Sequence, residues 1–194
     1  MKNNCGHIIG IDEAGRGPLA GPLVVGGIRI SLKFKVESSK FFKGVRDSKK
    51  LSPKKREEWF KKLTTNPGIG WAFAVISPKV IDKINILQSA HLGAYRVYKK
   101  LAGNCQCRAM LDGSLRLPAG IQHKVFIKGD ERFPIISAAS IIAKVMRDRM
   151  MTRLHKKYPM YGFDIHKGYG TTMHYARIKK FGISEIHRKT FRLI

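Results

Sequence analysis

At 194 residues the chain is long enough for one well-packed domain and short for two. Its hydrophobic content of 43% supports a real core, which excludes a disordered basic tail. The chain carries 38 Lys and Arg against 13 Asp and Glu, a formal net charge of +25, and a field of this size attracts polyanions. Nucleic acid is therefore the favoured partner, ahead of a ribosome-like role or an anionic lipid surface.

No membrane segment or secretory leader is expected. No run approaches the ~20 apolar residues that a membrane helix requires. The apolar stretch near the N-terminus is too short for the hydrophobic region of a signal peptide. Cys5, Cys105 and Cys107 have no zinc-ligand spacing, and we expect them to be reduced thiols. These features together predict a cytoplasmic protein.

The first half of the chain reads as strands with one helix between them. Residues 7–11 predict a short buried strand, and residues 22–30 predict a longer strand paired in a hairpin. Ser52 followed by Pro53 is a helix start, because serine caps the first turn and proline suits the first helical position. Residues 69–76 predict another strand.

The second half alternates helices and strands. Ser77 and Pro78 predict the start of a short helix, and residues 86–101 follow the 3.6-residue period of an amphipathic helix. Residues 108–111 and 124–127 predict short buried strands.

The C-terminal part is predicted to be helical. An apolar face within residues 138–145 indicates a long helix, and a last helix is expected over residues 172–181, ended by Gly182. Strands that alternate with capped helices indicate an α/β fold, and the β-rich opening favours a mixed sheet.

Three short blocks deliver carboxylates at the ends of apolar runs in a chain that is poor in acid. The acids are Asp12 and Glu13 in the first block, Asp112 in the second and Asp130 in the third. Carboxyl ends of strands are where α/β sheets bind ligands, and carboxylate oxygen suits Mg²⁺ or Mn²⁺. Neighbours on a strand face opposite sides, so Asp12 and Glu13 can share a site only if the strand ends there. The alternative is that Asp112 and Asp130 are turn residues.

The first block continues as Gly15-Arg16-Gly17. Its glycines permit a tight turn and close backbone approach. Successive backbone N–H groups of such a turn can bind a phosphate or a hydroxyl group.

The chain resembles the type 2 ribonucleases H, the ribonucleases HII of bacteria, over residues 10–191. The blocks that carry the resemblance stand in order: DEAGRGPLAGP at 12–22, DSKKLS at 47–52, LDG at 111–113, KGD at 128–130, SAASIIAKVMRD at 137–148, YGFDIHKGYGT at 161–171 and HRKTF at 187–191. The fold implied is ribonuclease H-like, a mixed five-stranded sheet flanked by helices, with a helical C-terminal region. It implies a single catalytic domain over residues 1–194, of which roughly 150–194 form the helical part.

The resemblance also implies the site. The family's four catalytic, metal-binding carboxylates fall on Asp12, Glu13, Asp112 and Asp130, which would hold two ions of Mg²⁺ or Mn²⁺. The turn that contacts the ribonucleotide falls on Gly15, Arg16 and Gly17. The tyrosine that recognises the RNA-to-DNA step falls on Tyr169.

Other polar residues receive weaker interpretations. Lys49, Lys50 and Lys167 are expected to contact phosphates. Asp148 lies between Arg147 and Arg149 in the sequence, and an ion pair is expected there in place of a metal ligand. Apart from His166, most histidines are expected to be surface or capping groups.

The expected function is an endonuclease that cuts RNA paired with DNA and single ribonucleotides embedded in duplex DNA, leaving 3′-hydroxyl and 5′-phosphate ends. Its partners would be those duplexes, with no membrane, and it is expected to be monomeric. Two alternatives remain: a non-catalytic basic nucleic-acid-binding protein, and a DNA-specific two-metal nuclease of the same fold. The first leaves the clustered acids unexplained, and the second leaves the glycine turn and Tyr169 without a task.

Overall fold

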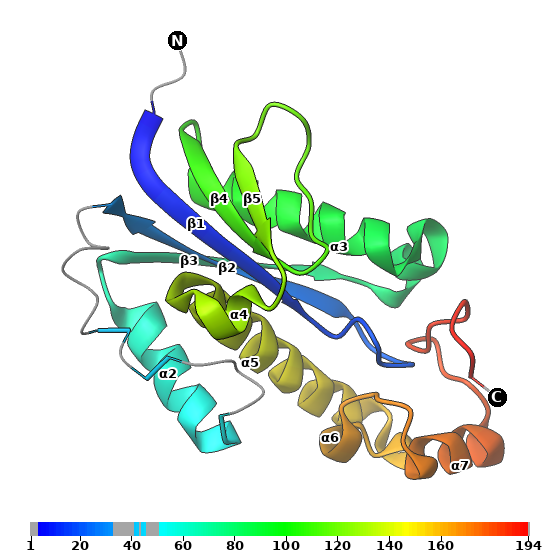
Figure 1. Cartoon of the computed structure of the whole chain (residues 1–194). Coiled ribbons are helices and arrows are strands. Elements are labelled where there is room, and N and C mark those ends of the chain that lie inside the picture. Colours follow the sequence, from blue (N-terminus) through cyan, green and yellow to red (C-terminus); the bar gives the residue numbers. More distant parts are fainter. Residues whose placement is uncertain (1–3, 33–40, 43, 46–50, 194) are drawn as a thin grey trace.

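The computed structural model describes residues 4–32, 41–42, 44–45 and 51–193. Within them, one mixed five-stranded sheet has the order β3-β2-β1-β4-β5 (Figure 1). Its strands are β1 (Asn4–Ala14), β2 (Leu23–Ser31), β3 (Ile69–Ile76), β4 (Gln106–Asp112) and β5 (His123–Phe126). β2 is antiparallel to β1 and β3, whereas β4 is parallel to β1 and β5. The predicted α/β class and mixed sheet are confirmed.

Helices cover both faces of the sheet. They are α2 (Pro53–Thr65), α3 (Pro78–Ala102), α4 (Gly129–Arg132), α5 (Pro134–Lys157), α6 (Phe163–His166) and α7 (Thr172–Phe181), with a 3-10 turn η2 (Pro159–Tyr161). α3 packs on one face, and α5 with α2 beside it packs on the other (Figure 1). The chain after α5 folds back through α6 and α7 near the end of β1, which brings the C-terminal segment close to the predicted site.

Local sequence signals set the helix ends. The Ser52 hydroxyl accepts a hydrogen bond from the Lys55 backbone N–H at 3.3 Å, and the cap ahead of α3 is built in the same way by Ser77. The backbone leaves the helical conformation at Asn85 (φ 59°, ψ 169°), so α3 consists of two helical pieces across a kink. This matches the predicted short helix and the longer one that follows it.

Small residues let the helices lie close to the sheet. Ile9 and Ile11 of β1 belong to the core on the α3 side, whereas Ile28 of β2 belongs to the core on the α5 side. At Gly26 a Cβ atom would lie 2.5 Å from the carbonyl oxygen of Ala139 in α5. No side chain fits at that distance, so glycine is required for α5 to approach β2.

Cys105 and Cys107 are free thiols, as expected, and the side chain of Cys5 lies outside the described part of the structure. Across the described residues, no helix combines the length and apolar character that crossing a bilayer requires.

Candidate active site

Three carboxylates from different parts of the chain meet at one end of the sheet. Asp12 lies in β1, Asp112 is the last residue of β4, and Asp130 lies in α4 just after β5. One carboxylate oxygen from each lies within 4.8 Å of the others. Asp12 and Asp130 are buried and Asp112 is partly exposed, so the cluster is reached from the side of Asp112.

The parallel strands bring these acids together. β1 and β4 pair with Ile11 opposite Leu111, so the next residue on each strand, Asp12 and Asp112, lie side by side. After β5 the chain turns at Lys128, which has a left-handed backbone (φ 53°), into the four-residue helix α4. Oδ1 of Asp112 accepts the backbone N–H of Gly129 at 2.6 Å, and this bond fixes the turn that carries Asp130.

The cluster concentrates negative charge away from water. Burial, followed by the nearby charges of Glu13 and Asp112, raises the pKa of Asp12 well above its usual value, against hydrogen bonds from Ser140 and from the Glu13 backbone that lower it. Ionised carboxylates this close repel one another unless a cation lies between them. Three oxygen donors from Asp side chains suit a hard divalent cation such as Mg²⁺ or Mn²⁺.

Glu13 does not join this cluster in the way its sequence position suggests. β1 continues through Glu13 to Ala14, both paired with β2, so the predicted strand over residues 7–11 is too short, and Asp12 and Glu13 both lie within β1. Neighbouring residues in a continuing strand point to opposite faces. Glu13 instead accepts a hydrogen bond from Arg16 at 3.3 Å, although its charge is near enough to raise the pKa of Asp12.

The glycine–arginine–glycine turn follows β1 directly. Gly15 is buried with φ 96°, a backbone conformation that favours glycine, and Gly17 is exposed. The half-exposed Arg16 donates to the Ser114 hydroxyl at 2.6 Å, which ties the turn to the loop after β4. The turn therefore lies beside the acidic cluster.

Tyr169 is presented next to this turn. The residue is 43% exposed, and a Cβ atom on Gly17 would lie 4.0 Å from its Cε1. Its N–H donates to the His166 carbonyl at 2.9 Å, and its own carbonyl accepts a hydrogen bond from Nδ1 of His174 at 2.9 Å. The guanidinium carbon of Arg147 lies 5.7 Å from the ring centroid. The ring of Tyr169 is accessible and its backbone is held in place. These features favour a role in contacting a ligand over a role in the hydrophobic core.

The structure gives less information about the three lysines that were predicted to contact phosphates. Lys49 and Lys50 lie outside the described residues. The Lys167 ammonium donates to the backbone carbonyl of Asp164 at 2.6 Å. Asp148 forms an ion pair with Lys144 at 2.8 Å, and Arg56 lies 3.9 Å away, which confirms an ion pair but with partners other than the adjacent arginines.

Two histidines that were expected at the surface, His174 and His187, are buried behind Tyr169 together with His166. His166, His174 and His187 are buried, and Nε2 of His174 lies 3.1 Å from Nε2 of His187. Nδ1 of His187 accepts the Ser184 N–H, so its Nε2 carries the proton, and Nε2 of His174 accepts it. Burial lowers the pKa of all three, that of His174 to about 4.

This histidine cluster predicts a loss of stability in acid. The unfolded chain binds a proton at His174 near pH 6.5 and the folded chain only near 4, so the free energy of unfolding falls as the pH drops through this window. The loss from His174 alone should reach roughly 3 kcal/mol. His174→Gln should show a shallower fall between pH 7 and 4.5 in urea unfolding. If the free energy of unfolding falls equally with pH in the variant and in the wild type, His174 is not the source of the acid sensitivity.

Sequence reasoning missed two buried arginines, Arg147 and Arg188. Arg147 donates to the carbonyls of Pro22 and Ala20 at 3.0 and 3.3 Å, and Arg188 donates to carbonyls of the glycine turn. Nothing marks a buried arginine in a chain with 38 basic residues. The only available signal was their place in two of the motif blocks.

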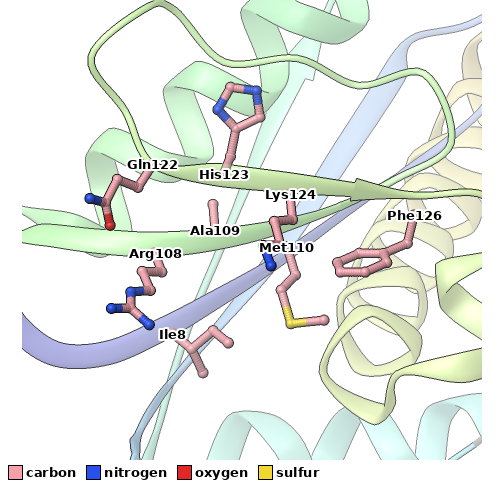
Figure 2. Close-up of a pocket in the computed structure, with 8 residues that line it drawn as sticks. All are labelled: Ile8, Arg108, Ala109, Met110, Gln122, His123, Lys124 and Phe126. Carbon is pink, nitrogen blue, oxygen red and sulfur yellow. The ribbon is translucent and has the colours of Figure 1, made fainter.

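A separate pocket opens on β4 and β5. Its volume is about 490 Å³, and Figure 2 shows its lining, which includes Arg108 and Met110 of β4 and Lys124 and Phe126 of β5. None of the three clustered aspartates lines it. The acidic cluster is therefore the site with evident chemistry.

An α/β sheet that ends in three clustered carboxylates, within a strongly basic chain, defines the class of divalent-cation-dependent nucleases. The sequence model of the family described as Ribonuclease HII matches residues 9–194. The chain belongs to the ribonuclease HII family and is an endonuclease that hydrolyses phosphodiester bonds.

Individual relatives agree over nearly the whole chain. A protein named Ribonuclease HII from Chlamydia muridarum is 44% identical over 191 residues, which is 98% of this chain and 84% of the relative. The ribonuclease H2 structure from Pyrococcus horikoshii OT3 is 31% identical with a TM-score of 0.75, covering 96% of this chain and 94% of that one. A structure of the PCNA:RNase HII complex from Archaeoglobus fulgidus gives 28% identity and a TM-score of 0.78, with 96% of each chain covered. The predicted family and fold are confirmed.

Proposed function

We propose that this protein cuts the RNA strand of RNA/DNA hybrids and single ribonucleotides embedded in duplex DNA, leaving 3′-hydroxyl and 5′-phosphate ends. The observation that carries the proposal is the adjacency of two features: the cluster of Asp12, Asp112 and Asp130, and the turn Gly15–Gly17 with Tyr169 beside it. The first can hold cations at a phosphate. The second offers backbone donors and an accessible ring for reading a sugar.

Asp12, Asp112 and Asp130 would hold the divalent ions. Glu13 lies outside this cluster of three, but its charge is near enough to raise the pKa of Asp12, and it would be a further ligand. When bound, two such ions supply Lewis-acid stabilisation of the phosphate and lower the pKa of a coordinated water. Asp112 also fixes the backbone of Gly129, so it would position Asp130 as well as bind metal. Arg16 neutralises part of the charge on Glu13 and holds the glycine turn against Ser114.

The substrate is distinguished by its 2′-hydroxyl group. This group tells RNA from DNA at a given position, and backbone N–H groups of the turn are suited to donate hydrogen bonds to its oxygen. Tyr169 would pack on the sugar that follows the ribonucleotide. Lys49, Lys50 and Lys167 would add phosphate contacts.

We also propose that residues 1–194 form a single catalytic domain, with roughly 150–194 as its helical part. Hydrogen bonds from Arg188 to the carbonyls of Gly15, Arg16 and Gly21 support this, since the C-terminal segment then belongs to the site and is not an appendage.

One assay tests the activity. The protein is incubated with Mg²⁺ or Mn²⁺ and three labelled duplexes: DNA with one ribonucleotide, a continuous RNA/DNA hybrid, and all-DNA. We expect cleavage of the first two only, and phosphatase treatment should shift the downstream fragment because it carries a 5′-phosphate. Cleavage of all-DNA would support a DNA-specific nuclease, and binding without cleavage of any duplex would support a non-catalytic binder.

The charge of +25 predicts steeply salt-dependent binding. Affinity should fall by about one power of salt concentration for each phosphate neutralised. Fluorescence anisotropy between 50 and 300 mM KCl, without divalent metal, should give nearly the same slope for all-DNA and hybrid duplexes. An affinity that does not change with salt would mean that the basic surface is not the binding face.

A further inference from the structure

Arg188 is an arginine whose side chain is completely buried at the base of the glycine turn. Its exposed fraction is 0%, although it lies near the C-terminus and its partners lie near the N-terminus. Nη2 donates to the Gly15 carbonyl at 2.6 Å, Nη1 to the Arg16 carbonyl at 2.8 Å, and Nε to the Gly21 carbonyl at 3.1 Å. One planar guanidinium group thus binds three carbonyls of the turn and its exit.

These bonds fix which way the turn's peptide groups face. A trans peptide is planar, with its C=O and N–H pointing in opposite directions. The Gly15 carbonyl shares a peptide with the Arg16 N–H, and the Arg16 carbonyl shares one with the Gly17 N–H. Because both carbonyls point to Arg188, both N–H groups point away from it. In the described part of the chain, neither N–H donates to another backbone group of a turn, loop or cap.

The residues packed around the turn hold its peptide groups in this orientation. Gly15 is packed against Arg147, whose Nε would lie 2.0 Å from a Cβ atom there. The backbone of Arg188 is itself anchored, because its N–H donates to the Leu19 carbonyl at 2.8 Å. The following residues are held by Asp82, which accepts the N–H groups of Lys189 and Thr190 at 3.1 Å each.

We propose that Arg188 is a positioning residue for ribonucleotide recognition, which turns the Gly15 and Arg16 carbonyls inward so that the N–H groups of Arg16 and Gly17 face the substrate. The inference rests on the proposed function and adds to it the residue that orients the reading surface. Burying a guanidinium group is costly unless its donors are satisfied, and here the turn's own carbonyls satisfy them. Lysine offers a single ammonium and cannot reproduce this planar fork.

The test compares Arg188→Lys with Asp82→Asn, a matched control that loosens the same C-terminal segment and keeps the guanidinium. Arg188→Lys should lower kcat/KM for the single-ribonucleotide duplex by about a hundredfold, the scale expected for a misplaced binding group. Its Mn²⁺ affinity, measured by calorimetry, should stay at the wild-type value because the aspartate cluster is untouched. Asp82→Asn should lower the melting temperature and keep the wild-type kcat/KM. Arg188→Lys with wild-type kcat/KM would overturn the proposal.

A second measurement needs no variant. In ¹⁵N-labelled wild-type protein, the Arg16 and Gly17 amides should shift and gain protection from exchange on binding a duplex with one ribonucleotide, but not on binding all-DNA. Equal responses to the two duplexes would overturn the positioning role while leaving cleavage intact. A wild-type protein that binds in this way but cleaves neither ribonucleotide substrate would instead overturn the proposed function, so the two failures are distinguishable.

Discussion

Asp12→Asn should abolish cleavage, with kcat reduced by about a thousandfold or more. Metal ions at such a site provide several kcal/mol of charge stabilisation, and each 1.4 kcal/mol corresponds to a tenfold change in rate. Asparagine keeps the size of the side chain and one oxygen but removes the charge at the buried centre of the cluster. Asp112→Asn should behave in the same way. Single-turnover cleavage of the labelled single-ribonucleotide duplex measures both variants.

The same substitution should not weaken the fold. The raised pKa of Asp12 means that the folded chain holds its proton to higher pH than the unfolded chain, so ionised Asp12 lowers stability as the pH rises. In EDTA at pH 7, Asp12→Asn should therefore melt at the wild-type temperature or above it. A clearly lower melting temperature would mean that Asp12 stabilises the core instead of serving the site.

Asp148→Asn is the matched control among the acids. Asp148 lies on α5 and its carboxylate is paired with Lys144, outside the cluster of three. The variant should retain appreciable activity. Full activity in Asp12→Asn, or complete loss in Asp148→Asn, would remove the assignment of the metal site.

Tyr169→Ala should change the choice of substrate and leave the metal site working. Contacts of an aromatic side chain with a nucleotide are worth about 1–3 kcal/mol by alanine substitution, which corresponds to roughly 5- to 150-fold. The single-ribonucleotide duplex should lose this much in kcat/KM relative to the continuous hybrid, because only the former presents a deoxyribose after the ribonucleotide. Parallel assays on the two duplexes give the ratio.

If Tyr169 were a core residue, the substitution would lower stability instead of changing the choice of substrate. A large side chain in the core costs several kcal/mol when it is replaced by alanine. Tyr169 is 43% exposed, and the hydrogen bonds of its backbone to His166 and His174 do not depend on its side chain. We therefore expect only a small change in melting temperature. Early melting, or a wild-type ratio of the two activities, would show that Tyr169 does not read the junction.

Signals that act within a few residues were predictable from the sequence. The strand Ile69–Ile76, the serine–proline helix starts at Ser52 and Ser77, and the end of α7 at Gly182 all appear as predicted. The short helices α4 and α6 were not predicted, because four residues carry no measurable period.

The acidic cluster was partly predictable. Parallel strands end at the same edge of a sheet, so an acid at the end of each apolar run placed Asp12 and Asp112 together. The length of β1 was not predictable, because the apolar run over residues 7–11 is shorter than the strand, which pairing with β2 extends through Glu13 to Ala14. Because the pairing with β2 decides which face of the sheet the Glu13 side chain lies on, the place of Glu13 relative to the cluster could not be predicted either.

The sequence by itself determined the α/β class, the basic surface and the family, because these follow from local periodicity, composition and ordered motifs. Only the tertiary structure decided which charged and polar side chains are buried. Arg188 and His174 resemble surface residues in the sequence, and they become internal because carbonyls and ring nitrogens from distant segments satisfy their hydrogen bonds. A buried polar group is tolerated only with such partners, and those partners exist only once the C-terminal segment has folded back against the turn after β1.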